Sequence, residues 1–533
     1  MGDDKEQYSS LFLSFQRMGY FVRESKNLLD ILDDAREKYP AQIALVDTDS
    51  RITYETLWRK AKAVANVFSI NGIKKGDHVV SWFNNRIEYF ESLFGLFMIG
   101  AVPILLLPTH RKKELFTIAE FGEAKAIVTY GADLGFDYLE VAKEYVKDKD
   151  NDVKLFAFRQ SEGVICLSEA EDAPYFKPTI INGEDTALFL LSGGTTSIPK
   201  LIPRTHAAYY YNAKCCANRC DTNRTSVYLA ALSVSHDYPL CAPGVFGTML
   251  HGGKTVLSMT ASFDEISGYI KDERVTFTQI APIVLSMWIN CMELGEEADL
   301  SSMKYIQIGA AKLEEELAKK AEELMGIKII QGYGLGEGIT CFTSPDDDKN
   351  IAWNTQGTPV SEYDEVRIVD EDGNDVQMGG VGELIECGPY TFEGYYNDKK
   401  RNSELFTEDG YFKTGDKAMI TSEGRIKILG RIREQINRAG ENVIPSEIEE
   451  YLKKCEGVED AAVFGMEDEY LGERICAVLV SSNQKTLQDI CFELSIQGLA
   501  PYKLPDELHY VESMPLINVG KIDKRKLREQ ITR

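Results

Sequence analysis

A loop rich in glycine and hydroxyl side chains carries the first residues of this sequence that could do chemistry. It reads Ser192-Gly193-Gly194-Thr195-Thr196-Ser197-Ile198-Pro199-Lys200 and follows a predicted strand at residues 186–191. Glycines allow backbone N–H groups to approach phosphate oxygens, hydroxyls add donors, and a lysine neutralises phosphate charge. The spacing differs from a Walker A loop, which disfavours a kinase or GTPase. In isolation, such a loop is more often a flexible surface segment.

Four further groups of residues follow in a definite order. They are Gln331-Gly332-Tyr333-Gly334-Leu335-Gly336-Glu337, Tyr411-Phe412-Lys413-Thr414-Gly415-Asp416, Gly430-Arg431-Ile432-Arg433-Glu434-Gln435-Ile436 with Gly440 and Glu447-Ile448-Glu449, and residues 515–521 with Asp523 and Lys524. The glycines of the first group lack the spacing of a Rossmann loop. Together with the glycine-rich loop, the four groups resemble the ordered motifs of the adenylate-forming superfamily, which includes acyl-CoA synthetases and nonribosomal peptide synthetase adenylation domains.

A narrower resemblance concerns the free-standing enzymes that adenylate aryl acids such as 2,3-dihydroxybenzoate and salicylate. It is carried by Leu107-Pro108-Thr109-His110-Arg111, Pro199-Lys200-Leu201-Ile202-Pro203-Arg204-Thr205-His206, Gly388-Pro389-Tyr390-Thr391-Phe392 with Gly394-Tyr395-Tyr396, and Gln435-Ile436-Asn437-Arg438. The resemblance implies that ATP activates an aryl carboxylic acid to an acyl-adenylate with release of pyrophosphate. The acyl group would then pass to the pantetheine thiol of an acyl or aryl carrier protein.

The resemblance also implies roles for single residues. Glu337 would hold Mg²⁺, a hard ion suited to carboxylate and phosphate oxygens. Lys521 would bridge the substrate carboxylate and the α-phosphate, and His236 would join these two in the catalytic set. Tyr333 would stack on adenine, and Asp416 would accept from the ribose hydroxyls. The residues expected to bind ATP or AMP are Ser192, Gly193, Gly194, Thr195, Thr196, Lys200, Gly309, Ala310, Ala311, Gln331, Gly332, Tyr333, Gly334, Asp416, Ile428, Arg431 and Lys521.

A hinge is implied at Arg433, a position where the family often has Asp or Lys. In the family, the C-terminal domain rotates about this hinge after adenylation, a form of domain alternation. Lys521 would then leave the site, and the face around Gly440 would enter to admit the thiol. A second departure from the family pattern is Ala310, which lies in a turn that often has two glycines.

The identity of the acid depends most on Asp237 and Ala242. Dihydroxybenzoate-activating relatives typically have Asn and Ser at these positions. Ala242 offers no hydrogen bond, so a buried 3-hydroxyl would cost about 1–3 kcal/mol. An ionised Asp237 only accepts, which favours an amino- or hydroxy-substituted benzoate, unless Asp237 is tied to a neighbour such as His236. The residues expected to bind the acid are His236, Asp237, Tyr238, Ala242, Gly309, Gly338 and Ile339.

Several readings stay open at this point. An aryl-CoA ligase is an alternative, because CoA and carrier proteins both end in pantetheine. A β-amino acid adenylating enzyme is another, since amino-acid-activating relatives also use an Asp for the substrate amine. A non-catalytic nucleotide-binding homologue is a distant one, because Glu337, Asp416 and Lys521 are all present.

These residues need a scaffold, and the hydrophobic pattern predicts one. Strands at residues 78–83, 102–107, 126–129, 186–191, 227–232, 255–257, 275–280 and 305–308 alternate with helices at 54–71, 86–99 and 206–218. Such alternation is typical of parallel βαβ units. Beyond Trp353, short strands at 366–370, 382–387, 411–413 and 425–429 are separated by Asp-Gly and Glu-Gly turns, which predicts antiparallel, barrel-like pairing.

The expected fold therefore combines α/β and α+β parts. Residues 1–430 would form a large N-terminal domain of two βαβ-type subdomains and a small β-barrel-like subdomain, residues 431–433 the hinge, and residues 434–533 a small mobile α+β domain. In that last domain we expect helices at 446–455 and 486–494 and strands at 458–464 and 475–481. Ser446 is predicted to cap the first helix, with Glu449 three residues on.

Composition excludes several classes of protein. The 533 residues carry a formal net charge of −25, which disfavours binding to nucleic acid or anionic membranes. The longest uncharged run, residues 92–107, is short for a membrane span and contains glycine and proline. Eleven cysteines form no CxxC pair, and the N-terminus does not resemble a signal peptide, so we expect a cytoplasmic protein with reduced thiols.

Overall fold

The computed structural model describes residues 26–147, 149, 153–173, 176–192, 200–311, 313–370, 372–431, 436–517, 521–522 and 524–532. Two sets of predicted site residues are affected by these bounds. Gly193, Gly194, Thr195 and Thr196 of the glycine-rich loop and the hinge residue Arg433 lie outside the described residues. The strands, helices and turns that surround them are described.

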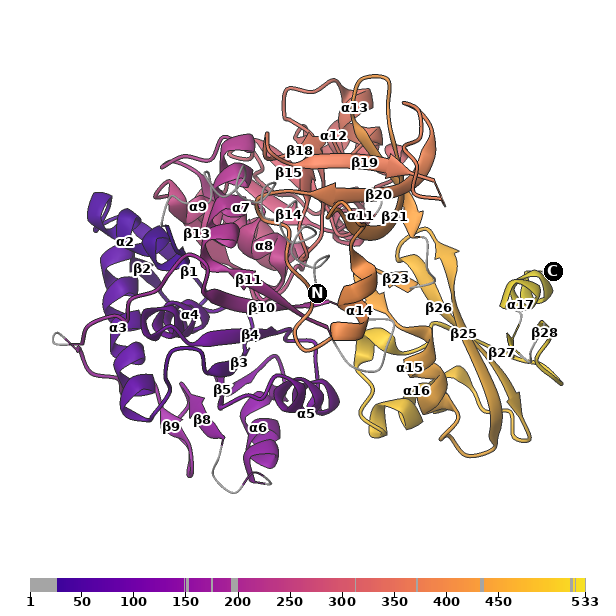
Figure 1. Cartoon of the computed structure of the whole chain (residues 1–533), viewed down its shortest axis with the longest axis horizontal. Helices are drawn as coiled ribbons and strands as arrows, with labels where there is room; N and C mark the ends of the chain where they lie inside the picture. The colour runs from indigo at the N-terminus through magenta and orange to yellow at the C-terminus, as the bar shows by residue number, and fades with distance from the viewer. Residues whose placement is uncertain are drawn as a thin grey trace, which may run out of the picture.

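A seven-stranded sheet forms the first βαβ-type unit (Figure 1). Its strands are parallel except for β11, which pairs antiparallel with β10. In spatial order they are β11 Lys200–Thr205, β10 Thr186–Ser192, β4 Val102–Leu106, β3 His78–Trp82, β5 Ala126–Thr129, β8 Lys154–Ala157 and β9 Ile165–Cys166. The four strands predicted in this region are confirmed, with ends that agree within one residue.

A nine-stranded sheet forms the second unit. Its central strands are parallel, and β2, β17 and β18 at its two edges pair antiparallel. In spatial order they are β18 Thr358–Pro359, β17 Thr340–Phe342, β16 Lys328–Gly334, β15 Tyr305–Ile308, β14 Phe277–Ile280, β12 Val227–Ala230, β13 Lys254–Leu257, β1 Ile43–Val46 and β2 Arg51–Thr53. The parallel strands predicted here are confirmed.

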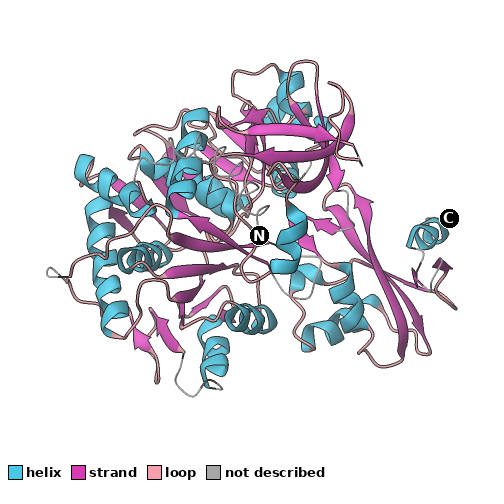
Figure 2. Ribbon diagram, viewed as in Figure 1, coloured by secondary structure: helices cyan, strands magenta, loops and turns pink. Residues whose placement is uncertain are grey.

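Helices fill the space between the two sheets and cover their outer faces (Figure 2). The inner helices are α2 Leu28–Lys38, α3 Tyr54–Ile70, α4 Ile87–Ile99, α7 His206–Arg219, α8 Asp237–Cys241 and α9 Gly244–Leu250. The outer helices are α5 Lys112–Phe121, α6 Tyr138–Lys147, α10 Phe263–Glu273, α11 Pro282–Glu293, α12 Glu315–Met325 and α13 Lys349–Asn354. Helix α14 Lys399–Leu405 has no buried residue. Alternate strand residues face the two layers: Val79 of β3 packs with the inner helices, and Val80 packs with α5 and α6.

A separate antiparallel sheet follows, drawn in orange at the top of Figure 1. It consists of β19 Glu365–Val369, β20 Val381–Cys387, β21 Phe412–Ile420 and β22 Ile426–Arg431. The predicted antiparallel pairing is confirmed, but the barrel-like closure is wrong for the residues described, because β19 and β22 are the two edges of an open sheet. Strand β21 extends to Ile420, well beyond the predicted residues 411–413, because its buried positions continue at every second residue.

The C-terminal region, from residue 436 onward, has its own sheet and core, yellow at the right of Figure 1. The strands are β24 Glu441–Val443, β23 Ile436–Arg438, β26 Gly472–Ser481, β25 Val458–Asp468 and β27 Glu507–Tyr510, with the small pair β28 Leu516–Ile517 and β29 Lys521–Ile522. The helices are α15 Pro445–Leu452, α16 Leu487–Ile496, the short 3-10 helix η1 Pro501–Lys503 and α17 Lys524–Ile531. This confirms a small α+β unit at the C-terminal end.

The predicted cap of α15 is wrong. The helix begins at Pro445, and Ile444 takes the cap position without a side-chain hydrogen bond. Proline suits the first helical position because its φ is already helical and it has no N–H to satisfy. Ser446 is therefore inside the first turn. The predicted hinge at residues 431–433 stays a prediction, because residues 432–435 lie outside the described part.

From the sequence we expect reduced cysteines and no membrane-spanning helix, and the structure bears on both expectations. All eleven cysteines are free. Among the described helices, none combines the length and the apolar character that crossing a membrane requires.

Candidate active site

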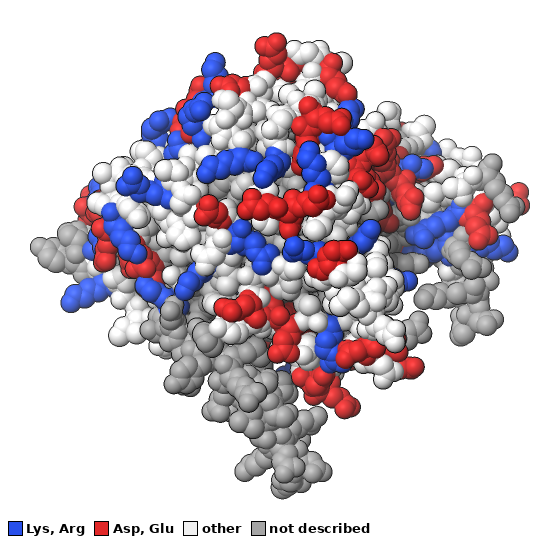
Figure 3. Space-filling view, turned by 90° about the horizontal axis from the view of Figure 1, so that it is seen from above, with Lys and Arg blue, Asp and Glu red and all other residues white. Residues whose placement is uncertain are grey.

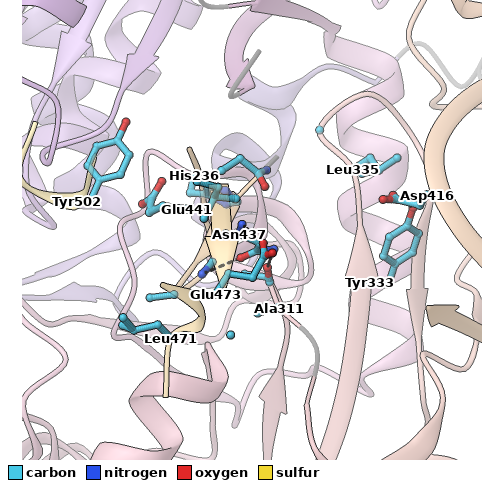
Figure 4. Close-up of a pocket in the computed structure, with 18 of the residues that line it drawn as sticks. His236, Ala311, Tyr333, Leu335, Asp416, Asn437, Glu441, Leu471, Glu473 and Tyr502 are labelled. Atoms are coloured by element: carbon cyan, nitrogen blue, oxygen red, sulfur yellow. Dashed lines mark hydrogen bonds between the residues drawn. The ribbon is translucent and has the colours of Figure 1, made fainter. Parts of the chain in front are cut away.

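A cavity of about 1700 Å³ lies where the carboxyl ends of the parallel strands meet the C-terminal region. Leu107 follows β4, Ala310 follows β15 and His236 lies on the loop after β12, and all three line it. Ligands of open α/β sheets bind at such strand ends. The predicted site residues that line this cavity are Lys200, His236, Asp237, Ala310, Ala311, Gly332, Tyr333, Gly334, Glu337, Asp416, Ile428 and Gly440. Figure 4 labels His236, Ala311, Tyr333 and Asp416 among them. The motifs that are far apart in the sequence thus meet in one place.

One wall of the cavity pairs an aromatic ring with a buried carboxylate. Tyr333 at the end of β16 donates a hydrogen bond of 2.6 Å from its hydroxyl to Asp416 Oδ2 on β21 (Figure 4). Asp416 is 3% exposed, and Tyr333 and Asp416 both line the cavity, as do Gly332 and Gly334. A planar ring can stack on a base, and a carboxylate accepts from sugar hydroxyls. The pair therefore fits the nucleoside part of ATP.

A second wall joins a lysine, a tyrosine and a glutamate. The hydroxyl of Tyr395 donates a 2.6 Å hydrogen bond to Glu337 Oε1, and Lys200 Nζ lies 3.4 Å from that hydroxyl and 4.7 Å from the ring centre. Glu337 is buried but lines the cavity. A lysine suits phosphate groups as a point charge, and one carboxylate beside substrate phosphates suits Mg²⁺. Glu337 is therefore the residue that would hold the metal, which would neutralise phosphate charge in the reaction.

The third wall carries Asp237, the first residue of α8. Its Oδ1 accepts a hydrogen bond of 2.6 Å from the hydroxyl of buried Tyr209 on α7. Its Oδ2 makes no hydrogen bond to any residue that the structure describes, and Asp237 lines the cavity. Burial raises the pKa of Asp237, and the guanidinium of Arg204 and the Tyr209 hydroxyl oppose this shift. The neighbour that holds Asp237 is thus Tyr209 and not His236.

His236 stands just before α8 and is exposed to the cavity. Its Nδ1 accepts from the backbone N–H of Tyr238 at 3.3 Å, which caps the short helix. Glu441 of the C-terminal region lies beside it in Figure 4, and burial raises the pKa of Glu441 while the imidazole opposes the rise. Glu441 was not among the predicted site residues.

Six predicted contact residues lie behind the cavity walls: Tyr238, Ala242, Gly309, Gln331, Gly338 and Ile339. A Cβ on Gly309 would come within 2.7 Å of the Tyr238 ring, and a Cβ on Gly338 within 2.1 Å of Glu386 Oε1. Gln331 donates from its side-chain amide to the carbonyls of Ala352 and Trp353. These residues support the walls from outside, so their predicted direct contacts with ligands gain no support from this geometry.

The C-terminal region closes one side of the cavity with a turn at residues 437–440. Asn437 Nδ2 donates to the Ala310 carbonyl at 3.4 Å, and a Cβ on Gly440 would lie 3.3 Å from Ala310 Cβ. Ala310 has φ +67°, the left-handed region that favours glycine. The close approach of the two backbones thus needs Gly440 and a small residue at 310.

The predicted catalytic residue Lys521 belongs to the C-terminal region. It lies in β29, which pairs with β28 at the far right of Figure 1, on the side of the C-terminal region that faces away from the two large sheets. The side chains of Ser192, Arg431 and Lys521 are not described. The structure therefore brings the Gly440 turn to the site, while the backbone of Lys521 lies on the far side of the C-terminal region.

Comparison with known proteins places this site in a family. Residues 32–396 match the family described as AMP-binding enzyme, and residues 447–521 match the AMP-binding enzyme C-terminal domain. Similar curated proteins include the 2,3-dihydroxybenzoate-AMP ligase of Bacillus subtilis strain 168, 38% identical over 94% of this chain and 93% of that protein. Another is the salicyl-AMP ligase / salicyl-S-ArCP synthetase of Mycobacterium tuberculosis, 34% identical over 97% of this chain and 93% of that protein.

A solved structure is also similar to this chain in both sequence and fold. The apo structure of MbtA from Mycobacterium smegmatis is 35% identical in sequence, with a TM-score of 0.73 and coverage of 96% of each chain. The fold also resembles the amide bond synthetase McbA from Marinactinospora thermotolerans, with a TM-score of 0.83 at 22% identity over 95% of this chain and 99% of that one.

Proposed function

The chain belongs to the AMP-binding enzyme family and is an adenylate-forming acid–AMP ligase, and we propose that its acid is an amino- or hydroxy-substituted benzoate. The relatives named 2,3-dihydroxybenzoate-AMP ligase and salicyl-AMP ligase support an aryl acid. The product would be the aryl-adenylate, formed with release of pyrophosphate. The aryl group would then pass to the thiol of a pantetheine.

The observation that carries this proposal is the second oxygen of Asp237. Because Tyr209 holds Oδ1, Oδ2 remains as an acceptor at the cavity wall. An amino or hydroxyl substituent donates to such an oxygen, whereas unsubstituted benzoate would leave it without a partner at a cost of about 1–3 kcal/mol. A β-amino acid also carries a suitable donor and is the second candidate.

The two half-reactions would use the residues as follows. Lys200 would bind ATP phosphates, Glu337 would hold Mg²⁺, and Tyr333 with Asp416 would bind the nucleoside. Adenylation brings two anions together, so positioning and charge neutralisation dominate its rate. Lys521 would enter for that step after rotation about the hinge near Arg433. The orientation described here, with the Gly440 turn on the Ala310 loop, would serve the transfer to the thiol.

A carrier protein fits the cavity mouth better than free coenzyme A. Three segments at the cavity, α12 with its preceding residue, the β25–β26 hairpin and α17, contribute the charged lining residues Glu314, Glu316, Glu467, Asp468, Glu469 and Glu473 against Lys320 and Arg528. Seen from above, acidic side chains gather where the right-hand part of the molecule meets the main body (Figure 3). The diphosphate and 3′-phosphate of coenzyme A would be repelled there, whereas a carrier-bound pantetheine brings a single phosphodiester.

The test is ATP–pyrophosphate exchange with Mg²⁺ and a panel of aminobenzoates, hydroxybenzoates, salicylate, 2,3-dihydroxybenzoate, benzoate and β-amino acids. We expect exchange to be strongest with a benzoate that carries an amino or hydroxyl donor. Exchange with β-amino acids alone would move the enzyme out of the aryl class. Equal exchange with benzoate and its substituted forms would remove the role proposed for Asp237.

A further inference from the structure

Beside the active site, four charged residues join the N-terminal and C-terminal parts of the chain. Lys503 of η1 donates to Glu447 Oε2 of α15 at 3.0 Å and to Glu114 Oε1 of α5 at 3.1 Å. Lys113 of α5 donates to Glu447 Oε1 at 3.1 Å, and its ammonium lies 4.1 Å from the Tyr451 ring centre. All four residues line the cavity. The cluster alternates in charge and spans both parts of the chain.

Because three of its four residues are buried, this cluster can form in only one orientation of the C-terminal region relative to the N-terminal part. Lys503, Glu114 and Glu447 are at most 8% exposed. Buried lysine and glutamate side chains are rare unless they are paired, and a buried charge that loses its partner is costly. Glu114 cannot follow Lys503 in a rotation, because its Oε2 accepts from the Arg111 N–H at 3.0 Å and so caps α5. Rotation of the C-terminal region would therefore break the bond between Lys503 and Glu114.

Neighbouring charged and polar groups favour the charged forms of both Lys503 and Glu114. Burial alone would lower the pKa of Lys503, but Tyr502 and the two carboxylates outweigh it, and the pKa is raised. The pKa of Glu114 is lowered: burial opposes this shift, and Lys503 is the main cause of it. Burial lowers the pKa of nearby His110 to about 4, so its imidazole is neutral and does not compete with Lys503 for the carboxylates.

The same orientation places the 437–440 turn against Ala310. We propose that Lys503, through its bond to Glu114, is a positioning residue that holds the C-terminal region in the orientation for thiol transfer. This inference rests on the proposed function. Lys503 acts on thioester formation and not on adenylation, because the bond to Glu114 forms in only one of the two orientations.

Glu114→Gln tests the proposal most directly. It removes the charge of Glu114 that faces Lys503 across the interface, keeps the Lys113–Glu447 pair, and leaves Lys503 with Glu447 in its own part of the chain. The full-length variant is assayed for pyrophosphate exchange and for thioester formation with pantetheine, using an aryl acid that the wild type activates. We expect thioester formation to fall about tenfold, equivalent to about 1.4 kcal/mol, and exchange to change less than twofold. Glu144→Gln is the matched control, because Glu144 pairs with Lys112 of the same helix α5 within the N-terminal part.

Two further variants separate positioning from other roles. Lys503→Met should reproduce the Glu114→Gln pattern, and Lys503→Arg should restore much of the transfer rate, since arginine can also bridge two carboxylates. A fall with Lys503→Met but not with Glu114→Gln would overturn the proposal, because Lys503 would then contact the acceptor itself. Equal falls in both half-reactions would also overturn it. A wild type that forms no adenylate would instead refute the proposed function.

Discussion

The hydroxyl of Tyr209 donates a 2.6 Å hydrogen bond to Asp237 Oδ1, whereas Oδ2 of the same carboxylate, at the cavity wall, accepts no hydrogen bond from any described residue. The two residues come from α7 and α8, 28 positions apart. Tyr209 is fully buried, so the surrounding packing restricts it to one rotamer. Its hydrogen bond therefore holds the Asp237 carboxylate in one rotamer as well. The proposed specificity of the site for a donor on the acid rests on this arrangement.

Asp237→Asn should weaken selection among benzoates. The amide can still accept from Tyr209, but it replaces the charged acceptor in the cavity. We expect kcat/KM for an amino- or hydroxy-substituted benzoate to fall about ten- to a hundredfold, and that for benzoate to change little. Pyrophosphate exchange across the panel measures both. An unchanged order of kcat/KM among the acids would show that Asp237 does not bind the substituent.

Tyr209→Phe is the companion variant. It leaves the carboxylate in place and removes the bond that orients it. The order of kcat/KM among the acids should be kept, but the differences between them should become smaller. The fall in kcat/KM for the substituted benzoate should be smaller than with Asp237→Asn. A thermal unfolding curve checks that the buried site still packs.

Tyr395→Phe should weaken the use of ATP and Mg²⁺. The variant keeps the ring beside Lys200 and loses the hydrogen bond to Glu337. A carboxylate that has lost its orienting partner holds a metal less well, so we expect the Mg²⁺ concentration for half-maximal exchange to rise about tenfold. Tyr396→Phe is the control, because that hydroxyl has a contact of 3.5 Å with Glu123, exposed to solvent. Equal effects of the two variants would contradict the role of Tyr395.

The scaffold of the site could be predicted from the sequence because strand ends and motifs coincide. His236 and Ala310 follow apolar runs that the pattern identifies as β12 and β15, and parallel strands bring such ends together. The length of strand β21 was underestimated from the sequence because Gly415 and Asp416 interrupt its apolar pattern at the site. Strand pairing, and not local composition, extends it to Ile420.

Contacts between distant segments could not be predicted. The bond between Tyr395 and Glu337 joins residues 58 positions apart, and that between Lys503 and Glu114 joins residues 389 apart. Neither pair has a local spacing that signals it. The orientation of the C-terminal region depends on such contacts. In the proposed two-step cycle, the predicted role of Lys521 and its backbone position in the structure would belong to different steps.

Charge at the cavity mouth should make coenzyme A a poor acceptor. Exposed Glu467 lies near the end of β25 and exposed Glu469 in the turn between β25 and β26, and no ion pair to a described residue offsets them. We expect the double variant Glu467→Lys/Glu469→Lys to lower KM for coenzyme A about fivefold at low salt and less at 0.5 M salt, where screening is strong. Transfer to uncharged pantetheine should not change. Glu162→Lys, on the distant turn between β8 and β9, is the control, and an equal effect there would indicate net charge alone.

A buried carboxyl on β20 should make stability depend on pH. Glu386 is 1% exposed, accepts from Thr391 at 2.6 Å, and has a pKa that burial raises from an ordinary value of 4.5 to about 8. Between these values the folded protein keeps a proton that the unfolded chain has lost, so stability falls as pH rises from 4.5 to 8. Glu386→Gln removes this dependence. We expect the variant to be more stable than the wild type by about 1–3 kcal/mol at pH 8.5, with little difference at pH 5. Denaturant unfolding at both pH values measures this, and Glu393→Gln, an exposed neighbour, should show no such gain. A Glu386→Gln variant that is less stable than the wild type at pH 8.5 would mean that the carboxyl is ionised in the folded protein, with a partner that offsets its burial.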